Sequence, residues 1–450
     1  MPDSTPSNDS PPSSLQDRRN FLDEQRNYRL LQLYRAVVAL TAVIVIVCLG
    51  LIVAAFRIHH HRRGRELRTS KAVSARAEVL SNGSWRFIVS GDSRNCGDLV
   101  MPAIAAHSSQ FAPAFYWHLG DLRAIYKIDE DMAFEAANRG QVLSCENYHR
   151  LAWSDFEENQ IAAFGDIPFY LGIGNHEVIP PKNEDAFKRQ FADWLDLPVL
   201  KEQREKDKEP PQAEPYYHWI QGGVDFIYLD NALNRFSRPQ LDWFKKRLHA
   251  DTPAANTEVK SVVVGMHEAL PDSLGNSHSM GDDKGGAEGR ATGKEAYEAL
   301  EQFREDSRNP DGTHKGVYVL ASHSHFYMEN IFDTDELTDH HKKQPLAGWI
   351  VGTAGAVRYA LPENPPKTAK TDVYGYLLGT VAADGTIQFS FQEIHESDIP
   401  QEVRQRYPDS LVPWCFARNS QNKEPLARDI TPRCPVPQTQ AESGKAKPAK

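Results

Sequence analysis

Five short stretches of the sequence end in acidic, amide or imidazole side chains that could bind metal ions or transfer protons. Each stretch starts with an apolar run and ends in a polar or Gly-containing turn. The residues at these turns are Asp92; Asp121; Asn175, His176 and Glu177; His267; and His323 with His325. The set offers oxygen and nitrogen donors without thiolates, which favours Zn, Mn, Fe or Co over a structural zinc held by cysteines.

The spacing of His323 and His325 adds to this expectation. Side chains two residues apart in an extended chain point to the same side. Two imidazoles at this spacing could therefore serve two adjacent ions that share one carboxylate. One Asp after Gly is usually a turn residue, and one buried His usually belongs to a hydrogen-bonded core. Histidines at three separate strand ends are harder to explain by folding alone.

The segments that carry these residues are predicted to be buried strands. They cover residues 85–94, 114–123, 167–177, 224–231, 260–268 and 316–325. Helices are expected between them, for example over 238–248 and 294–304. Alternating strands and helices indicate an α/β architecture, in which sites form beyond the carboxyl ends of the strands.

Two later segments are predicted to be strands with no helix between them. They cover residues 348–356 and 374–394, and the second contains the hairpin signal Asp384–Gly385. We therefore expect a mixed sheet, or two packed sheets, in place of one purely parallel sheet.

The ordered motifs resemble those of the calcineurin-like metallophosphoesterases. They are Gly-Asp at 91–92, Gly-Asp at 120–121, Gly-Asn-His-Glu at 174–177, Met-His at 266–267 and Ser-His-Ser-His at 322–325. The resemblance covers about residues 86–394. It implies a four-layer αββα sandwich of two mixed sheets, a centre of two divalent or trivalent ions (Mn, Zn or Fe), and hydrolysis of phosphomonoesters or phosphodiesters by a metal-activated water.

The resemblance also implies a role for each motif residue. The implied metal ligands are Asp92 and His325 for one ion, Asn175, His267 and His323 for the other, and Asp121 as the bridge. His176 would protonate the leaving group, and Glu177 would support the turn. Arg94 and Arg123 would stabilise charge on the transferred phosphoryl group.

The first motif departs from the family pattern at Arg94. The family has Asp-x-His, or Asp-x-Gly in purple acid phosphatases, where this chain has Asp92-Ser93-Arg94. A guanidinium cannot replace a neutral imidazole as a ligand. Either the first site has one protein ligand fewer, or Arg94 displaces that ion and leaves a mononuclear variant. Arg94 could also bind a substrate phosphate through two hydrogen bonds. The tyrosine ligand of purple-type enzymes is absent, since Ala124 stands at its position.

Other features leave alternatives open. The segment 265–283 could place Glu268, His278 and Ser279 over the site as a substrate loop. A catalytically weak sensor or binding module on the same fold is a second class of function. The net charge of −10 argues against a nucleic-acid surface, which is normally basic. The expected partner is thus a phosphoester of unknown size.

The uncharged apolar run over residues 36–56 predicts a single-pass membrane anchor, since about 20 apolar residues span a bilayer as a helix. The predicted organisation is a tail (1–34), the anchor (35–57), a basic stalk (58–82), the metallophosphoesterase domain (83–395), a C-terminal extension (396–435) and a disordered tail (436–450).

Orientation of the anchor rests on two opposing signals. Basic residues flank the run on both sides, and their slight excess after it favours a cytoplasmic domain. Four cysteines outside the run, Cys96, Cys145, Cys415 and Cys434, could instead form two disulfides in an oxidising compartment. The expected pairs are Cys96 with Cys145 and Cys415 with Cys434. We favour an extracytoplasmic, periplasmic domain.

Overall fold

The computed structural model describes residues 83–275, 278–282, 286–341, 344–422 and 430–435, and the five isolated residues Arg26, Leu30, Leu31, Leu33 and Arg35. The predicted anchor run at 36–56, the stalk and the last tail lie outside these residues. Within the described part, no helix combines the length and the apolar character needed to cross a membrane. The chain divides into two compact units, 1–67 and 68–450, and the architecture below belongs to the second.

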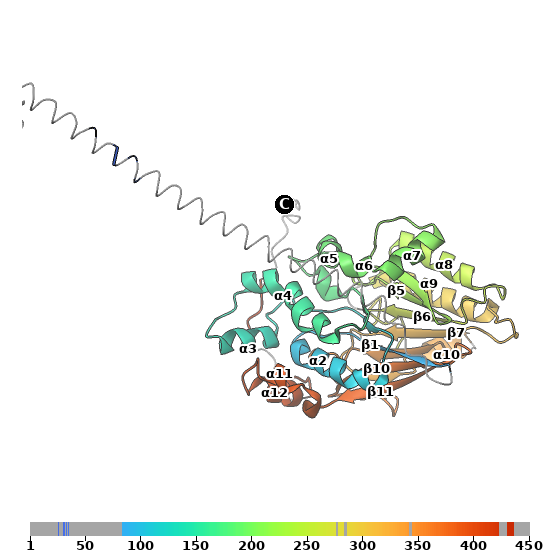
Figure 1. Cartoon of the computed structure of the whole chain (residues 1–450). Coiled ribbons are helices and arrows are strands. Elements are labelled where there is room, and N and C mark those ends of the chain that lie inside the picture. Colours follow the sequence, from blue (N-terminus) through green and yellow to red (C-terminus); the bar gives the residue numbers. More distant parts are fainter. Residues whose placement is uncertain are drawn as a thin grey trace, which may run out of the picture. The chain divides into compact units, whose positions relative to one another are not determined.

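The first sheet has five strands in the order β11-β10-β1-β2-β3 (Figure 1). The strands are β1 (Trp85–Ser90), β2 (Tyr116–His118), β3 (Phe169–Leu171), β10 (Tyr374–Val381) and β11 (Ile387–Ile394). β1, β2 and β3 are parallel, whereas β10 is antiparallel to β1 and to β11. The turn between β10 and β11 contains Asp384 and Gly385, as predicted, and the Asp384 side chain accepts a hydrogen bond from the Thr386 amide.

The second sheet has six strands in the order β4-β5-β6-β7-β9-β8. They are β4 (Tyr217–Gln221), β5 (Val224–Leu229), β6 (Ser261–Met266), β7 (Gly316–Ala321), β8 (Tyr327–Glu329) and β9 (Ala347–Val351). β5, β6, β7 and β9 are parallel, and the strands at both edges are antiparallel to their neighbours. The expectation of an α/β protein with two mixed sheets is confirmed.

A buried aromatic layer joins the inner faces of the two sheets. Phe87 and Phe115 of the first sheet contact Phe226 of the second edge-to-face, with ring centroids 5.0 and 5.1 Å apart. Trp219 stacks on Tyr170 across the same interface at 3.8 Å. Such large apolar groups remove the most surface from water per residue and favour offset or edge-to-face contacts. This layer fixes the sheets relative to each other, and with them the strand ends.

Helices cover the outer faces. The α-helices of this unit are α2 (Gly97–Ser108), α3 (Glu130–Asn138), α4 (Cys145–Asn159), α5 (Glu184–Gln190), α6 (Ala192–Leu195), α7 (Pro198–Asp207), α8 (Arg238–Asp251), α9 (Gly286–Asp306), α10 (Asp335–His341), α11 (Gln401–Arg404) and α12 (Leu411–Pro413). The single-turn elements are η1 (Ser109–Phe111), η2 (Ile161–Phe164), η3 (Asn175–Val178), η4 (Glu396–Asp398) and η5 (Trp414–Arg418), the last a π-helix.

The two predicted helices are present as α8 and part of α9. Ser237 caps α8 by accepting a hydrogen bond from the Gln240 amide, and Pro239 lies in its first turn, where no amide partner is needed. On β5 the side chains alternate. Phe226 faces the aromatic layer, while Ile227 packs in a second cluster with Leu241 of α8 and Leu300 of α9.

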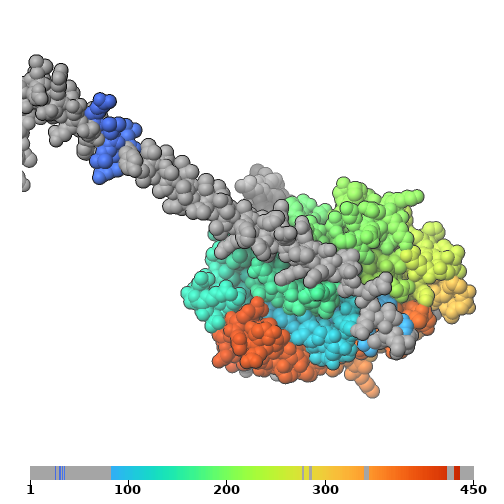
Figure 2. Space-filling view, in the orientation of Figure 1, coloured from blue at the N-terminus to red at the C-terminus, as the bar shows by residue number. Residues whose placement is uncertain are grey.

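The four cysteines form two disulfides, but the expected pairing is wrong. The bonds are Cys96–Cys415 and Cys145–Cys434. The C-terminal extension folds back so that α11 and α12 lie beside α2 and α3 (Figure 2). This places Cys415 at the start of α2 and Cys434 at the start of α4. Each bond therefore joins the extension to the first half of the domain.

Removing either bond is expected to lower the free energy of unfolding by about 2–5 kcal/mol, because a cross-link between distant residues restricts the unfolded chain. The Cys145→Ser/Cys434→Ser and Cys96→Ser/Cys415→Ser double variants test this by urea denaturation. Peptide mapping without reductant identifies the pairs. A peptide that links Cys96 to Cys145 would contradict the arrangement described here.

Candidate metal centre

The carboxyl ends of parallel strands bring the predicted motif residues to one edge of the two sheets. Asp92 follows β1, Asp121 follows β2, Asn175 follows β3, His267 follows β6 and His323 follows β7. Asp92, Asp121 and His267 are fully buried, and His323 is 9% exposed. The convergence expected from the strand-end pattern is therefore present in the fold.

The backbone of three of these residues is left-handed. The φ angles of Asp92, Asp121 and His323 are 61°, 62° and 64°, a region that costs non-Gly residues roughly 1 kcal/mol or more. Hydrogen bonds hold these turns: the Asp92 amide donates to Gly120 O at 3.0 Å, and the His323 amide donates to Asp92 Oδ2 at 2.7 Å. Unfavourable backbone geometry kept in this way is typical of functional sites.

Close packing also explains the glycine before Asn175. A Cβ atom at Gly174 would lie 2.4 Å from Asp121 Oδ1 and 2.9 Å from the His267 ring. The Gly174 position must therefore stay without a side chain so that Asp121 and His267 can approach each other.

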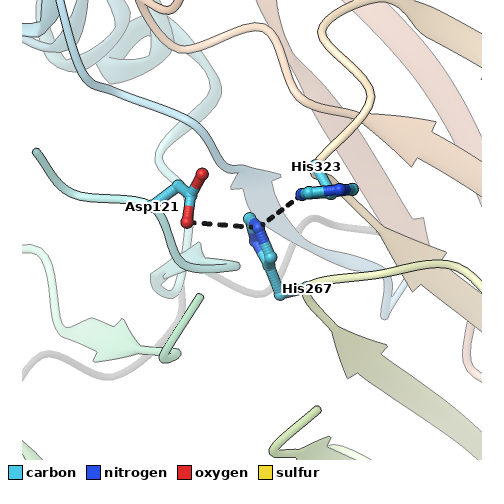
Figure 3. A group of neighbouring side chains, drawn as sticks. All are labelled: Asp121, His267 and His323. Carbon is cyan, nitrogen blue, oxygen red and sulfur yellow. Dashed lines mark hydrogen bonds and ion pairs between the residues drawn. The ribbon is translucent and has the colours of Figure 1, made fainter. Parts of the chain in front are cut away.

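The first ligand group surrounds His267 Nε2 (Figure 3). This nitrogen lies 3.2 Å from Asp121 Oδ1, 3.0 Å from His323 Nδ1 and 3.0 Å from Asn175 Oδ1. His267 Nδ1 donates to the Leu119 carbonyl at 3.0 Å, so Nε2 is the nitrogen that a metal ion could bind in place of a proton. Two oxygens and another imidazole nitrogen face this atom, a donor set that a proton or a metal cation can balance.

Protonation of His267 is consistent with this donor set. Burial disfavours the charged ring, but the adjacent Asp121 carboxylate overcomes this and raises the pKa of His267 to about 10. Burial and the His267 charge lower the pKa of His323. A proton on His267 thus balances the carboxylate when no metal is bound. The donor set fits a divalent cation that accepts nitrogen and oxygen ligands.

The second ligand group consists of Asp92, Asp121 and His325. His325 Nδ1 donates to the Val357 carbonyl at 2.7 Å, which leaves Nε2 as the acceptor, 3.1 Å from Asp92 Oδ1. Asp121 belongs to both groups, as a bridging ligand would. Its Oδ2 is buried and has no hydrogen-bond partner among the described residues.

Arg94 lies inside this second group. Its Nη2 donates to His325 Nε2 at 2.9 Å, and its Nε is 3.6 Å from Asp121 Oδ2. Arg94 is 4% exposed. The structure therefore places Arg94 among the residues expected to bind an ion.

His176 and Glu177 occupy the turn η3 beside Asp121. His176 Nδ1 donates to the Ala124 carbonyl at 2.6 Å, and its Nε2 lies 3.4 Å from Asp121 Oδ2. Burial, with Arg94 nearby, lowers the pKa of His176 to about 3. Glu177 accepts hydrogen bonds from the amides of Asp121, Leu122 and Gly174 at 2.8–3.0 Å. Glu177 thus ties the turn after β2 to the turn after β3.

The structure corrects the role expected for Arg123, which was to stabilise charge on the phosphoryl group together with Arg94. Its guanidinium points away from the ligand groups and forms ion pairs with Asp98, Asp131 and Asp155. The Arg123 side chain is fully buried. These carboxyl groups come from α2, α3 and α4, so Arg123 is the shared cation of an acidic cluster that joins three helices.

The three residues expected in a substrate loop have different environments in the structure. Glu268 is buried and accepts a hydrogen bond from Asn234 Nδ2. Ser279 is also buried, and its hydroxyl lies 2.7 Å from that of Ser273. These two positions do not favour contact with a substrate. His278 lies next to the centre, with its ring centroid 5.3 Å from that of His323.

Two tyrosines near the centre were missed by the sequence analysis. The Tyr359 ring centroid lies 3.9 Å from that of His325 and 5.2 Å from that of His278. Tyr126 lies 5.4 Å from His176 by the same measure. Tyr359 follows β9, whose carboxyl end reaches the same edge as those of β6 and β7. The predicted strand at β9 was the sequence signal that could have pointed to Tyr359.

A third group, Asp207, Glu209 and His218, could also hold an ion by its spacing alone. Its carboxylates already have cationic partners. His218 lies 2.7 Å from Asp207 and 2.9 Å from Asp225, and Arg247 pairs with Asp207 at 2.8 Å. Burial opposes protonation of His218, but these carboxylates raise its pKa to about 10. This group is a partly buried ion-pair network.

Comparison with known proteins finds only distant structural similarity. No family model and no curated protein matches the sequence. Among solved structures, the chain is similar to a purple acid phosphatase from yellow lupin (Lupinus luteus) seeds, with 14% identity over 70% of this chain and 52% of that one and a TM-score of 0.46. The chain thus spans about half the length of the lupin enzyme.

Two further solved structures are similar at this distance. PhoD has 14% identity over 69% of this chain and 72% of its own, with a TM-score of 0.40. A dimetal phosphatase from Danio rerio has 10% identity over 69% and 98%, with a TM-score of 0.36. At these identities and TM-scores the likeness supports no conclusion by itself, and the chemistry is argued from the side chains. In motif order the chain resembles the calcineurin-like metallophosphoesterases, and the solved structures similar to it include purple acid and dimetal phosphatases.

Proposed function

We propose that this protein is a metal-dependent phosphoester hydrolase. The observation that carries the proposal is the position of Asp121, whose carboxylate belongs to both ligand groups at the meeting point of the two sheets. When bound, a divalent cation would act as a Lewis acid that lowers the pKa of a water molecule and polarises the phosphoryl group. His267, His323, Asn175 and Asp121 are the residues that would hold it.

The remaining site residues have distinct proposed tasks. Arg94 supplies a fixed positive charge next to the centre, which favours binding of the phosphoryl anion. His176 is the proposed proton donor to the leaving oxygen, through Nε2, since its Nδ1 is bound to Ala124 O. Because its pKa is low, the resting His176 ring is neutral, and it would take up that proton from solvent before donating it. Glu177 positions Asp121 by holding its amide.

A catalytically weak binding or sensor module on the same fold is the competing proposal. Assays with chromogenic phosphomonoesters and phosphobisesters, each with added Mn²⁺ or Zn²⁺, separate the two. We expect metal-dependent turnover that a chelator abolishes and added metal restores. Absence of turnover with every metal, with the same result for Asp121→Asn, would favour the binding module.

We also propose that the domain is anchored in a membrane and faces away from the cytoplasm. The apolar run at 36–56 and the two disulfides support this, since disulfides persist in oxidising compartments. Protease added to cells whose outer envelope has been permeabilised, with the inner membrane intact, is expected to digest the domain. Protection of the domain until the inner membrane is lysed would reverse the orientation.

A further inference from the structure

We propose that the Arg94 guanidinium permanently fills one of the two ion positions, so that the centre takes one divalent cation. This inference rests on the proposed function and specifies its metal content. The single ion would lie in the group built around His267 and His323. The position framed by Asp92 and His325 would hold the arginine in its place.

The contacts of Arg94 coincide with those that an ion would need. The ligand atoms of that position are Asp92 Oδ1, an oxygen of Asp121 and His325 Nε2. Arg94 contacts His325 Nε2 at 2.9 Å and approaches Asp121 Oδ2 at 3.6 Å. An ion would have to lie about 2.0–2.2 Å from the same atoms, in space that the guanidinium occupies.

The positive charge of Arg94 also argues against an ion at this position. Arginine stays protonated at any physiological pH, so Arg94 cannot become neutral to accommodate a cation. A divalent ion held by Asp121 and His325 would lie within a few ångströms of this charge in a buried site, where repulsion is weakly screened. The group around His267 has two imidazoles and an amide oxygen and no arginine. The two positions are therefore unequal, although they share Asp121.

Contacts of the neighbouring residues hold the loop that carries Arg94. The backbone therefore cannot shift and carry the Arg94 side chain out of the ion position. The amide of the next residue, Asn95, donates to Asp129 Oδ1 at 2.6 Å, and its side-chain oxygen accepts from the Val357 amide at 3.2 Å. Cys96 is bonded to Cys415. The Tyr359 ring packs against His325, with ring centroids 3.9 Å apart and the planes tilted by 31°.

The test measures metal per chain and the magnetic state of bound Mn²⁺. The full chain is loaded with Mn²⁺, desalted and measured by elemental analysis and electron paramagnetic resonance. We expect one Mn²⁺ per chain with the signal of an isolated ion. In Arg94→His, which restores an imidazole at the first motif, we expect two per chain with the signal of a spin-coupled pair. Arg94→Lys keeps the charge and should stay at one.

Each outcome is decisive. Two ions per wild-type chain, or no increase in a folded Arg94→His variant, overturns the inference. If Arg94→His does not fold, the wild-type stoichiometry and the isolated or coupled signal still decide. One ion without phosphoester turnover would sustain the role of Arg94 and refute the hydrolase proposal. Turnover with two ions would do the reverse.

Discussion

Replacing Asp121 by Asn is expected to lower kcat/KM for any phosphoester substrate by roughly 10³-fold and to reduce the metal content. The substitution keeps the size of the side chain but removes the only charge common to both ligand groups. His267 Nε2 would lose its contact with the Asp121 carboxylate at 3.2 Å, and Arg94 Nε would lose its contact with the same carboxylate at 3.6 Å. Steady-state assays and elemental analysis of the purified variant measure the two effects.

Asp242→Asn is the matched control, since Asp242 is an exposed residue of α8 that belongs to none of the ligand groups. It should leave activity and metal content unchanged. The circular dichroism spectrum of Asp121→Asn should match that of the wild type. An Asp121→Asn variant with unchanged turnover would remove the chemical basis of the proposed function.

Replacing Arg123 by Met is expected to lower the free energy of unfolding by about 3–5 kcal/mol. Loss of the guanidinium would leave Asp98, Asp131 and Asp155 without their shared partner in a buried cluster. A buried charge left without its counter-ion costs far more than an exposed pair gains. Urea denaturation followed by tryptophan fluorescence measures the loss.

Arg139→Met serves as the comparison for Arg123→Met. Arg139 forms an i,i+4 pair with Glu135, and its side chain is 65% exposed, so the expected loss is below about 0.5 kcal/mol. If Arg123→Met kept wild-type stability and lost activity instead, the position assigned to Arg123 would be wrong. The earlier expectation that it stabilises the phosphoryl group would then be the better one.

The strand-end residues could be predicted because their positions depend on local pattern. Apolar runs followed by Asp92, Asp121, Asn175, His267 and His323 are visible in the sequence, and parallel strands bring such ends together. The hairpin at Asp384–Gly385 and the helix from Arg238 have equally local signals. These features needed no knowledge of long-range packing.

The C-terminal extension could not be placed in this way. Its contacts join residues hundreds of positions apart, as in the Cys96–Cys415 bond, whose sequence separation is 319. Arg358 illustrates the same limit: its guanidinium donates to the carbonyls of Asn419, Cys415 and Phe416. No periodicity or spacing encodes such pairings, so the adjacent-cysteine pairing was the wrong choice.

The partners that the two arginine side chains contact also depend on tertiary structure. Arg94 and Arg123 each follow a strand-end Asp by two residues, so the sequence predicts the same role for both. The acidic cluster of α2, α3 and α4 holds Arg123, while Arg94 contacts the ligand groups and Tyr359. The strand β4 and the first turns of α9 were likewise not predicted: β4 is a five-residue edge strand, and Gly-rich sequence obscures the helical pattern at the start of α9.

Anomalous diffraction from crystals of the Mn²⁺- or Zn²⁺-loaded protein tests the central claim most directly, namely that these distant strand ends form a metal centre. We predict an anomalous peak about 2.0–2.2 Å from His267 Nε2 and His323 Nδ1, in contact with Asp121. Absence of a peak at these residues, or a peak only at Asp207, Glu209 and His218, would contradict it.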